Sequence, residues 1–193
     1  MGNKRIKLES IREIPVSSTQ VYPGQVLDIY LDHVQLPNGE IAKREVIRNC
    51  HASVILAFNE KGEILVEDQY RYPFDKIITE LPAGKGVEGE APKITAAREF
   101  EEETGYKATH LELLGLFSPS VGYSDEVMHI YLATGLIKTE QKLDADEFLR
   151  CYFTPFEKFC NRIKNNDIID GKTIAAIGYY LLKYKTIQKK KKE

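Results

Sequence analysis

The segment GKGVEGEAPKITAAREFEEETGY, residues 84–106, decides how the rest of the sequence is interpreted. Its first part carries three glycines within six positions, which permits a tight loop that brings backbone close to a ligand. Residues 91–104 then have apolar side chains at helical spacing, and Gly105 follows directly as a residue that ends helices. The segment therefore predicts a glycine-rich loop that leads into an acidic helix.

The acidic face of this helix is a candidate metal site. Glu99 lies beside Glu102 and Glu103 at i+3 and i+4, so three carboxylates share one face. Carboxylate oxygens suit a hard divalent cation, and Mg²⁺ combines a few of them with waters and substrate phosphate oxygens. Such a site would position and polarise a phosphoanhydride. The alternative is an exposed acidic face with basic partners, and Arg98 can pair with Glu102 at i+4.

The spacing of these residues matches a known motif. It is that of the Nudix box: Gly84, five residues, Glu90, seven residues, then Arg98-Glu99-x-x-Glu102-Glu103-x-Gly105. The sequence therefore resembles the Nudix hydrolases. Phe100 and Tyr106 stand where an aliphatic residue is usual, and we expect this to change packing more than chemistry.

Four segments outside the box are similar to the ADP-ribose pyrophosphatase branch of that family: residues 34–39, 44–46, 69–73 and 80–84. The resemblance implies that Arg44 and Glu45 contact the nucleotide and that Arg71 holds phosphate, for which arginine offers a planar fork. It also implies that the carbonyl of Ala83 ligates metal together with Glu99, Glu102 and Glu103. The expected cofactor is Mg²⁺, with Mn²⁺ as a substitute.

The branch also carries a general base on a mobile acidic loop, which can close over bound substrate. By that resemblance Glu147 is the first choice for the base, acting with Glu102 and Glu103. The usual central glutamate of the loop is replaced by Ala145, so Asp144 and Asp146 stay open as alternatives. His51 and His129 fall in apolar segments typical of hydrogen-bonded core histidines, and no catalytic role is assigned to them.

Strand-like segments dominate the sequence. They are expected at about 5–15, 25–34, 41–48, 51–58, 63–70, 76–81, 111–117, 127–133 and 148–153, with further helices from about 155 and at 173–184. The predicted fold is α+β, a mixed sheet sandwiched between helices, with an extra N-terminal antiparallel sheet as in the resembled branch. The predicted division is residues 1–50 for dimerisation and substrate contacts, 51–188 for the Nudix domain, and 189–193 for a basic tail.

The charge and cysteine content of the sequence indicate which kinds of partner and compartment to expect. The chain has 193 residues and a net charge of −2, so no global basic field recruits nucleic acid or a membrane surface. Its three cysteines form no CxxC pair, and charges scattered through the first twenty residues leave no apolar signal segment. We expect a cytoplasmic protein with a small-molecule substrate, and the resemblance implies a homodimer.

The predicted reaction is hydrolysis of the pyrophosphate of a nucleoside-diphosphate sugar. For ADP-ribose the products are AMP and ribose 5-phosphate. Val121 stands where the resembled branch usually has proline, so GDP-mannose or a UDP-sugar is the alternative substrate. A catalytically silent nucleotide-binding module is the second alternative, against which the presence of all four motif glutamates argues.

Overall fold

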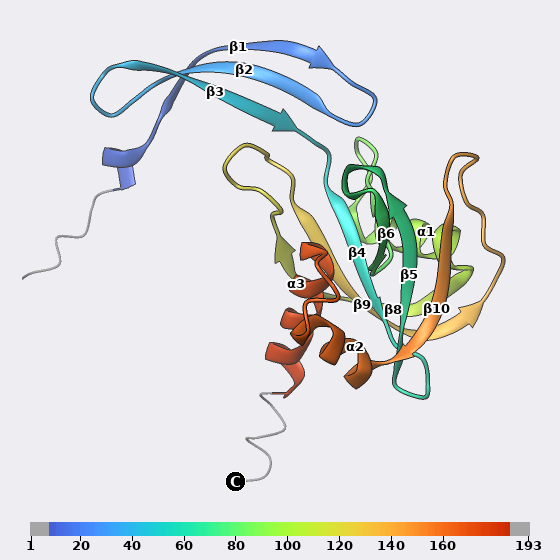
Figure 1. Ribbon diagram of the computed structural model, residues 1–193. Helices are drawn as coiled ribbons and strands as arrows, with labels where there is room; N and C mark the ends of the chain where they lie inside the picture. Colours follow the sequence, from blue (N-terminus) through green and yellow to red (C-terminus); the bar gives the residue numbers. More distant parts are fainter. Residues whose placement is uncertain (1–7, 186–193) are drawn as a thin grey trace, which may run out of the picture. The chain divides into compact units, whose positions relative to one another are not determined.

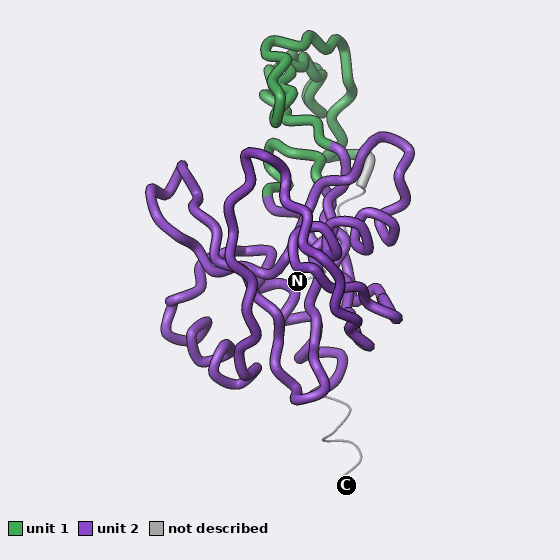
Figure 2. The backbone as a smooth tube through the Cα atoms, turned by 90° about the vertical axis from the view of Figure 1, so that its right-hand side faces the viewer, with its two compact units in different colours: residues 1–49, 120–126 green, residues 50–119, 127–193 purple. Residues whose placement is uncertain are grey.

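The computed structural model describes residues 8–185 (Figure 1). These residues form two compact units, residues 8–49 with 120–126 and residues 50–119 with 127–185 (Figure 2). The segment 120–126 belongs with the N-terminal strands because it is hydrogen-bonded to them: Ile47 N–H donates to the Tyr123 carbonyl at 2.7 Å. The basic tail expected at 189–193 lies outside the described residues.

The first unit is an antiparallel meander in the order β1-β2-β3. Its strands are β1 (Ile14–Pro23), β2 (Asp28–Gln35) and β3 (Ile41–Arg48), preceded by the 3-10 turn η1 (Leu8–Ile11). The prediction of a strand over 5–15 is wrong in its bounds, because residues 8–11 form that turn and the strand begins at Ile14. Every residue of β1 is exposed, so no buried alternation marked its position.

The second unit contains two sheets and three α-helices. A four-stranded sheet has the order β7-β4-β9-β8 and a three-stranded sheet the order β10-β5-β6. Strands β4 and β9 run parallel while the other pairs are antiparallel, so the larger sheet is mixed. The bounds are β4 (Ala52–Ala57), β5 (Glu63–Arg71), η2 (Tyr72–Phe74), β6 (Lys76–Glu80), β7 (Ala83–Lys85), α1 (Pro92–Thr104), β8 (Tyr106–Phe117), β9 (Met128–Lys138), β10 (Leu149–Pro155), α2 (Phe156–Lys164), α3 (Gly171–Tyr180) and the π-turn η3 (Leu181–Lys185).

The core of this unit lies on both faces of the sheets. Val54 and Leu56 of β4 join one apolar cluster, which includes Phe159 of α2 and residues of α3. Ile55 and Ala57 point the other way and join a second cluster that includes Phe100 of α1. A strand whose alternate residues are buried on opposite faces reads as a continuous apolar run. The predicted α+β sandwich of a mixed sheet between helices is confirmed.

Helix α1 is delimited as its sequence predicts. Pro92 stands at its first position, where a missing N–H costs nothing. Gly105 ends it with φ 68°, a left-handed conformation that glycine adopts without strain, and its N–H donates to the Glu101 carbonyl. Glu99, Glu102 and Glu103 therefore lie in the C-terminal half of the helix, where the helix dipole disfavours negative charge, whereas Glu90 precedes the helix.

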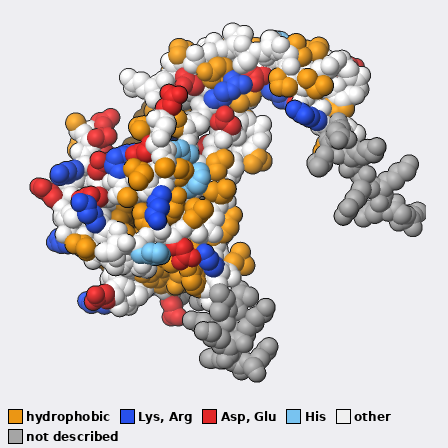
Figure 3. Space-filling view, turned by 180° about the vertical axis from the view of Figure 1, so that it is seen from behind, with side chains coloured by type: hydrophobic (Ala, Val, Ile, Leu, Met, Phe, Trp, Pro, Cys, Tyr) orange, Lys and Arg blue, Asp and Glu red, His pale blue; other side chains and the backbone are white. Residues whose placement is uncertain are grey.

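Hydropathy and charge of the described residues limit the kinds of surface that they can form. Within residues 8–185 there is no helix of the length and apolarity needed to cross a bilayer. On the face drawn in Figure 3, basic and acidic side chains are interspersed. This pattern matches the small net charge of the sequence.

Candidate active site

One guanidinium organises the first part of the carboxylate cluster. Arg98 donates to Glu90 through Nε at 3.1 Å and through Nη2 at 3.0 Å. Its Nη1 donates to Glu99 Oε1 at 2.7 Å and to Glu102 Oε2 at 3.2 Å. The predicted i+4 pairing of Arg98 with Glu102 is confirmed. Three box carboxylates therefore share one cation supplied by the chain.

The surroundings of Glu90 and Glu99 shift the pKa values of these two carboxyl groups in opposite directions. The Arg98 guanidinium, helped by the Thr95 hydroxyl, lowers the pKa of Glu90 to about 2. Burial raises the pKa of Glu99 even though Arg98 opposes that shift. Glu90 is therefore a firm anionic anchor for Arg98, whereas the Glu99 carboxylate lacks some of the solvation that its charge requires.

The first box glycine is required by the position of Glu99. A Cβ added to Gly84 would lie 2.0 Å from Cδ of Glu99, far inside contact distance. Gly84 is in β7, which pairs with β4 along Ser53. The carboxylate thus lies directly over the strand backbone, in space that any other residue at position 84 would fill.

Glu103 occupies a different environment on the same helix. Its side chain is buried, and its Oε2 accepts a hydrogen bond from the backbone N–H of Ala83 at 3.1 Å. Burial raises the pKa of Glu103 well above its usual range, and the nearby charges of Glu67 and Glu147 raise it further. The structure therefore brings together Ala83 and Glu103, two residues predicted to share a metal.

Glu67 is a member of this cluster that the sequence analysis missed. It follows Leu65 on the face of β5 that points toward α1, and it is only 1% exposed. Its Oε2 has no hydrogen-bond partner among the described residues, and burial raises the pKa of Glu67 to about 8. The sequence could have marked Glu67, because this glutamate directly continues the apolar run Ile64–Val66 of a buried strand. A buried acid without a charge partner is rare, so such a position is a candidate for a functional site.

The acidic loop contributes one residue to the cluster. Glu147 is half-buried, and its charge raises the pKa values of Glu67, Glu99 and Glu103. Burial raises the pKa of Glu147 itself. Asp144 and Asp146, the two alternatives for the base, are exposed. Of the three loop acids, Glu147 is the one placed among the box carboxylates.

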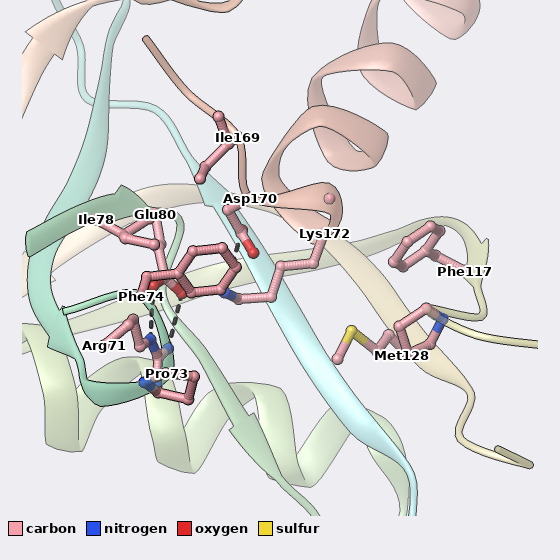
Figure 4. Close-up of a pocket in the computed structure, with 12 residues that line it drawn as sticks. Arg71, Pro73, Phe74, Ile78, Glu80, Phe117, Met128, Ile169, Asp170 and Lys172 are labelled. Atoms are coloured by element: carbon pink, nitrogen blue, oxygen red, sulfur yellow. Dashed lines mark hydrogen bonds and ion pairs between the residues drawn. The ribbon is translucent and has the colours of Figure 1, made fainter. Parts of the chain in front are cut away.

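Arg71 lies beside the cluster in an ion-pair network with Glu80 and Lys172 (Figure 4). Its Nε and Nη2 donate to the two oxygens of Glu80 at 2.6 and 2.7 Å. Lys172 Nζ also pairs with Glu80, and with Asp170 at 3.1 Å. Although burial opposes it, these cations lower the pKa of Glu80. Lys172, which lies in the first turn of α3, was not predicted as a site residue, because no motif in the sequence marks it.

A cavity of about 410 Å³ opens onto this network. Figure 4 shows Phe74 over Arg71 and Glu80, with Phe117 and Met128 at the other end of the cavity. Its walls are mostly apolar, while its base carries the four charged groups of the network. A cavity of this size and character can hold a sugar or a base next to a phosphate.

Arg44 and Glu45 belong to the first unit. The guanidinium of Arg44 is hydrogen-bonded to Glu13 and to the Lys43 carbonyl, and Glu45 is exposed. Both residues line a cavity of about 490 Å³ within that unit, together with Tyr123. Their contact with a nucleotide stays a prediction.

The chemistry of the carboxylate cluster suits a divalent cation. Within residues 8–185, no three acidic, histidine or cysteine side chains already stand together as a preformed ligand set. The donors are nevertheless hard oxygens, one oxygen of Glu67 has no hydrogen-bond partner among the described residues, and burial of Glu67 outweighs the attraction of Lys172 and Arg71 for its charge. A buried carboxylate without such a partner is costly, and a divalent cation removes that cost. The residues fit the ion.

Comparison with known proteins identifies the class. The family model of the NUDIX domain matches residues 47–177, and that of the nucleoside diphosphate sugar hydrolase N-terminal domain matches residues 13–47. The chain belongs to the Nudix family, whose hydrolases generally use divalent metal ions.

Particular relatives cover nearly the whole chain. An ADP-ribose pyrophosphatase of Bacillus subtilis (strain 168) is 39% identical over 91% of this chain and 96% of its own length. A methanol dehydrogenase activator of Bacillus methanolicus is 40% identical over 88% of this chain and 93% of its own. A crystal structure of an ADP compounds hydrolase superposes with a TM-score of 0.81 at 19% identity, covering 91% of this chain and 95% of that one, and so shares the fold.

Proposed function

We propose that the protein hydrolyses the pyrophosphate bond of a nucleoside-diphosphate sugar with Mg²⁺, and that ADP-ribose is its substrate. Mn²⁺ is expected to substitute for Mg²⁺. The observation that carries the proposal is a set of carboxylates near the end of α1, next to the Arg71 network and its cavity: Glu67, Glu99, Glu102, Glu103 and Glu147. The 39% identity to an ADP-ribose pyrophosphatase over most of both chains supports the choice of substrate.

The carboxylates would hold the metal and so orient the diphosphate. Glu99, Glu102 and Glu103 are the proposed side-chain ligands, with the carbonyl of Ala83. When bound, the divalent ion supplies charge neutralisation and polarises the phosphoanhydride oxygens. Glu67 adds a buried carboxyl group near Glu103, and when it is deprotonated it raises the negative potential of the site and its preference for a doubly charged ion.

Arg71 would contact the diphosphate with the donors that Glu80 leaves available. Glu80 accepts from Nε and Nη2, which leaves both protons of Nη1 for phosphate oxygens. Because its guanidinium is fixed at one edge by Glu80, Arg71 is oriented before substrate arrives. One half of the substrate would then enter the adjoining cavity.

Glu147 would accept the proton of the attacking water. Its half-buried carboxylate lies on a loop, and it is near the ligands without being hydrogen-bonded to Arg98. The raised pKa of Glu147 makes it a stronger base than an exposed carboxylate. The products from ADP-ribose would be AMP and ribose 5-phosphate.

The test is a substrate panel with and without metal. ADP-ribose, GDP-mannose, UDP-glucose and a dinucleoside polyphosphate are incubated with the protein and a phosphatase, and released phosphate is measured. We expect the highest kcat/KM for ADP-ribose and loss of activity in excess EDTA, restored by Mg²⁺. Equal activity with and without EDTA, or activity on none of the four compounds, contradicts the proposal. A preference for GDP-mannose or UDP-glucose would retain the reaction and change the substrate.

A homodimer is part of this proposal, with the first unit as the contact surface. Strand β1 is an edge strand whose residues are all exposed, and edge strands are usually covered or paired. Exposed apolar side chains cluster in this unit: Ile14, Val16, Val21, Tyr22, Val26 and Ile41. Light scattering at micromolar protein is expected to give twice the chain mass of 22.0 kDa. A single species of 22.0 kDa contradicts the dimer.

The cytoplasm is the proposed compartment. Cys50, Cys151 and Cys160 form no disulfide with one another, and burial raises the pKa of Cys151 to about 12. Cysteines that are not joined in disulfides are typical of reducing compartments. Fractionation of cells that express the tagged protein should place it with cytoplasmic markers.

A further inference from the structure

A hydrogen-bond chain runs from a histidine outside the cluster into the Nudix box. His51, just before β4, places Nε2 at 2.9 Å from the hydroxyl of Thr95 on α1. That hydroxyl donates to Glu90 Oε2 at 2.7 Å. Glu90 in turn accepts the two hydrogen bonds from Arg98 described above. His51 lies outside the Nudix box, and Thr95 lies in the seven-residue spacer of the box, so neither stands at one of its fixed positions.

The direction of each hydrogen bond is fixed by proton count. The Thr95 hydroxyl has one proton, and the Glu90 carboxylate can only accept, so Thr95 donates to Glu90. Thr95 must therefore accept from His51, which requires a proton on Nε2. The chain is thus polarised toward Glu90, and this direction strengthens each successive bond.

His51 is held so that it cannot easily turn away. A Cβ added to Gly86 would lie 2.2 Å from Nε2 of His51, so the loop backbone packs directly against the ring. The N–H of Gly86 donates to the His51 carbonyl at 2.8 Å. The ring of His129 meets that of His51 edge to face, with centroids 5.8 Å apart. Thr95 itself is fully buried.

The other end of the chain controls the Arg98 guanidinium. Glu90 uses both of its oxygens to hold Nε and Nη2, which fixes the plane of the guanidinium and the direction of Nη1. Nη1 is the group that contacts Glu99 and Glu102. If Glu90 rotates, Nη1 moves, and the two carboxylates move with it.

We propose that His51 and Thr95 are positioning residues of the metal site: they orient Glu90, and through Arg98 they set the geometry of Glu99 and Glu102. This inference rests on the proposed role of those two glutamates as metal ligands. Residues that orient ligands from outside the ligand set typically change metal affinity by about 10- to 100-fold when removed. Thr95 acts two residues further out, so a smaller effect of about 3- to 10-fold is expected.

A matched pair of variants separates this role from packing. Thr95→Val keeps the shape and branching of the side chain but removes the hydroxyl, whereas Thr95→Ser keeps the hydroxyl and removes a methyl group. Binding of Mn²⁺ is measured from the loss of the free-ion EPR signal, and ADP-ribose hydrolysis is measured against Mg²⁺ concentration. We expect Thr95→Val to raise both the Mn²⁺ Kd and the half-saturating Mg²⁺ by about 3- to 10-fold. Thr95→Ser should stay within twofold of wild type.

Variants at His51 provide an independent arm. His51→Gln retains a donor and His51→Leu does not, so only the second should weaken Mn²⁺ binding. Combining Thr95→Val with Glu90→Gln should add little to the effect of Glu90→Gln alone, because both act on the same carboxylate. A purely structural role would lower thermal stability while leaving the Mn²⁺ Kd unchanged.

The outcomes distinguish the two proposals. Wild-type protein that binds no Mn²⁺ and hydrolyses no substrate overturns the proposed function, and this inference with it. Wild-type binding and activity together with an unchanged Mn²⁺ Kd in Thr95→Val and His51→Leu overturns only the inference. Equal weakening by Thr95→Val and Thr95→Ser also overturns it, since packing would then account for the effect.

Discussion

The two halves of the carboxylate cluster solve the problem of buried negative charge in different ways. Around Arg98, three glutamates share a guanidinium, and the pKa of Glu90 is lowered to about 2. Around Glu67 and Glu103, burial outweighs every cation within reach, and the pKa of Glu67 is raised to about 8. In the first half, a guanidinium of the chain holds all three carboxylates and offsets one of their charges. The second half is complete only when a cation or a proton is added.

The largest effect is expected when a carboxylate of the second half is replaced by an uncharged amide. Glu103→Gln should lower kcat by roughly 10⁴-fold, because losing a ligand removes about 5–6 kcal/mol of stabilisation at 1.36 kcal/mol per tenfold. Glu102→Gln is expected to be similarly impaired, because Glu102 is also a proposed metal ligand although it lies in the first half of the cluster. The measurement is ADP-ribose turnover in saturating Mg²⁺, with circular dichroism to check the fold.

Glu101→Gln is the matched control for this experiment. Glu101 lies on the same helix but pairs with Lys107 at 3.2 Å, away from the cluster. Its turnover should stay near that of wild type. Unchanged hydrolysis by both Glu102→Gln and Glu103→Gln would remove the metal role from the box.

The acidic loop offers the next largest effect. Glu147→Gln should reduce kcat by about 10²- to 10³-fold, with little change in KM or metal affinity, because a base acts mainly in the transition state. Asp144→Asn and Asp146→Asn should matter less, since both side chains are exposed. All three variants need to be measured under one set of conditions. If Asp144→Asn has a greatly reduced kcat while Glu147→Gln is close to wild type, the general base is Asp144 and not Glu147.

The stability of the metal-free protein should depend on pH, because the second half contains buried carboxyl groups whose negative charge is not fully balanced. A carboxyl whose pKa is raised on folding binds its proton more tightly in the folded state. Its stabilising contribution is therefore complete below the unfolded value of 4.5 and is lost as pH rises through about 8. Each unit of raised pKa corresponds to about 1.4 kcal/mol, or about 2–4 °C in a domain of this size.

Thermal melts in EDTA should accordingly show a lower Tm at pH 8 than at pH 6. Added Mg²⁺ should restore more stability at pH 8, because it binds the deprotonated cluster. Glu67→Gln should flatten the pH dependence of the metal-free protein. If Tm rises between pH 6 and pH 8 in both wild type and Glu67→Gln, ionisation of Glu67 does not destabilise the folded protein.

The smallest effect is expected in the first half. Arg98→Lys keeps the positive charge but loses the fork that contacts Glu90, Glu99 and Glu102 together. These groups are partly exposed and screened by solvent, so the loss should be about 1 kcal/mol, or about 2–4 °C in Tm. Metal affinity should fall as well, measured as the Mg²⁺ needed for half-maximal activity. If Arg98→Lys is indistinguishable from wild type in both measurements, the fork does not organise the carboxylates.

The sequence was most informative where the relevant contacts are local. Helix α1 and the pairing of Arg98 with Glu102 follow from spacing within one helical turn, and both were predicted. Glu67, Glu80 and Lys172 come from β5, β6 and α3, and only the folded chain brings them together. The register that places Glu67 opposite Glu80 depends on long-range strand pairing, which no local pattern encodes.

Strand β1 was misplaced for a related reason. Sequence patterns detect a strand by the side chains that it buries, and β1 buries none within the chain. Its hydrogen bonds to β2 are formed by backbone groups that every residue carries. The apolar residues at 6, 8 and 11 drew the prediction toward the N-terminus instead.

The closeness of Gly84 to Glu99 has a consequence for engineering. Because the carboxyl group of Glu99 fills the volume that a side chain at position 84 would occupy, the two positions form one steric unit. A saturation library at position 84 should yield inactive variants almost without exception, including Gly84→Ala. Truncating the acid to Glu99→Ala removes all three of the atoms in conflict and should let the backbone accept Gly84→Ala without a clash, although the loss of the carboxylate would leave the double variant inactive. Attempts to redesign this enzyme should therefore begin at the cavity walls around Phe74 and leave this pair untouched.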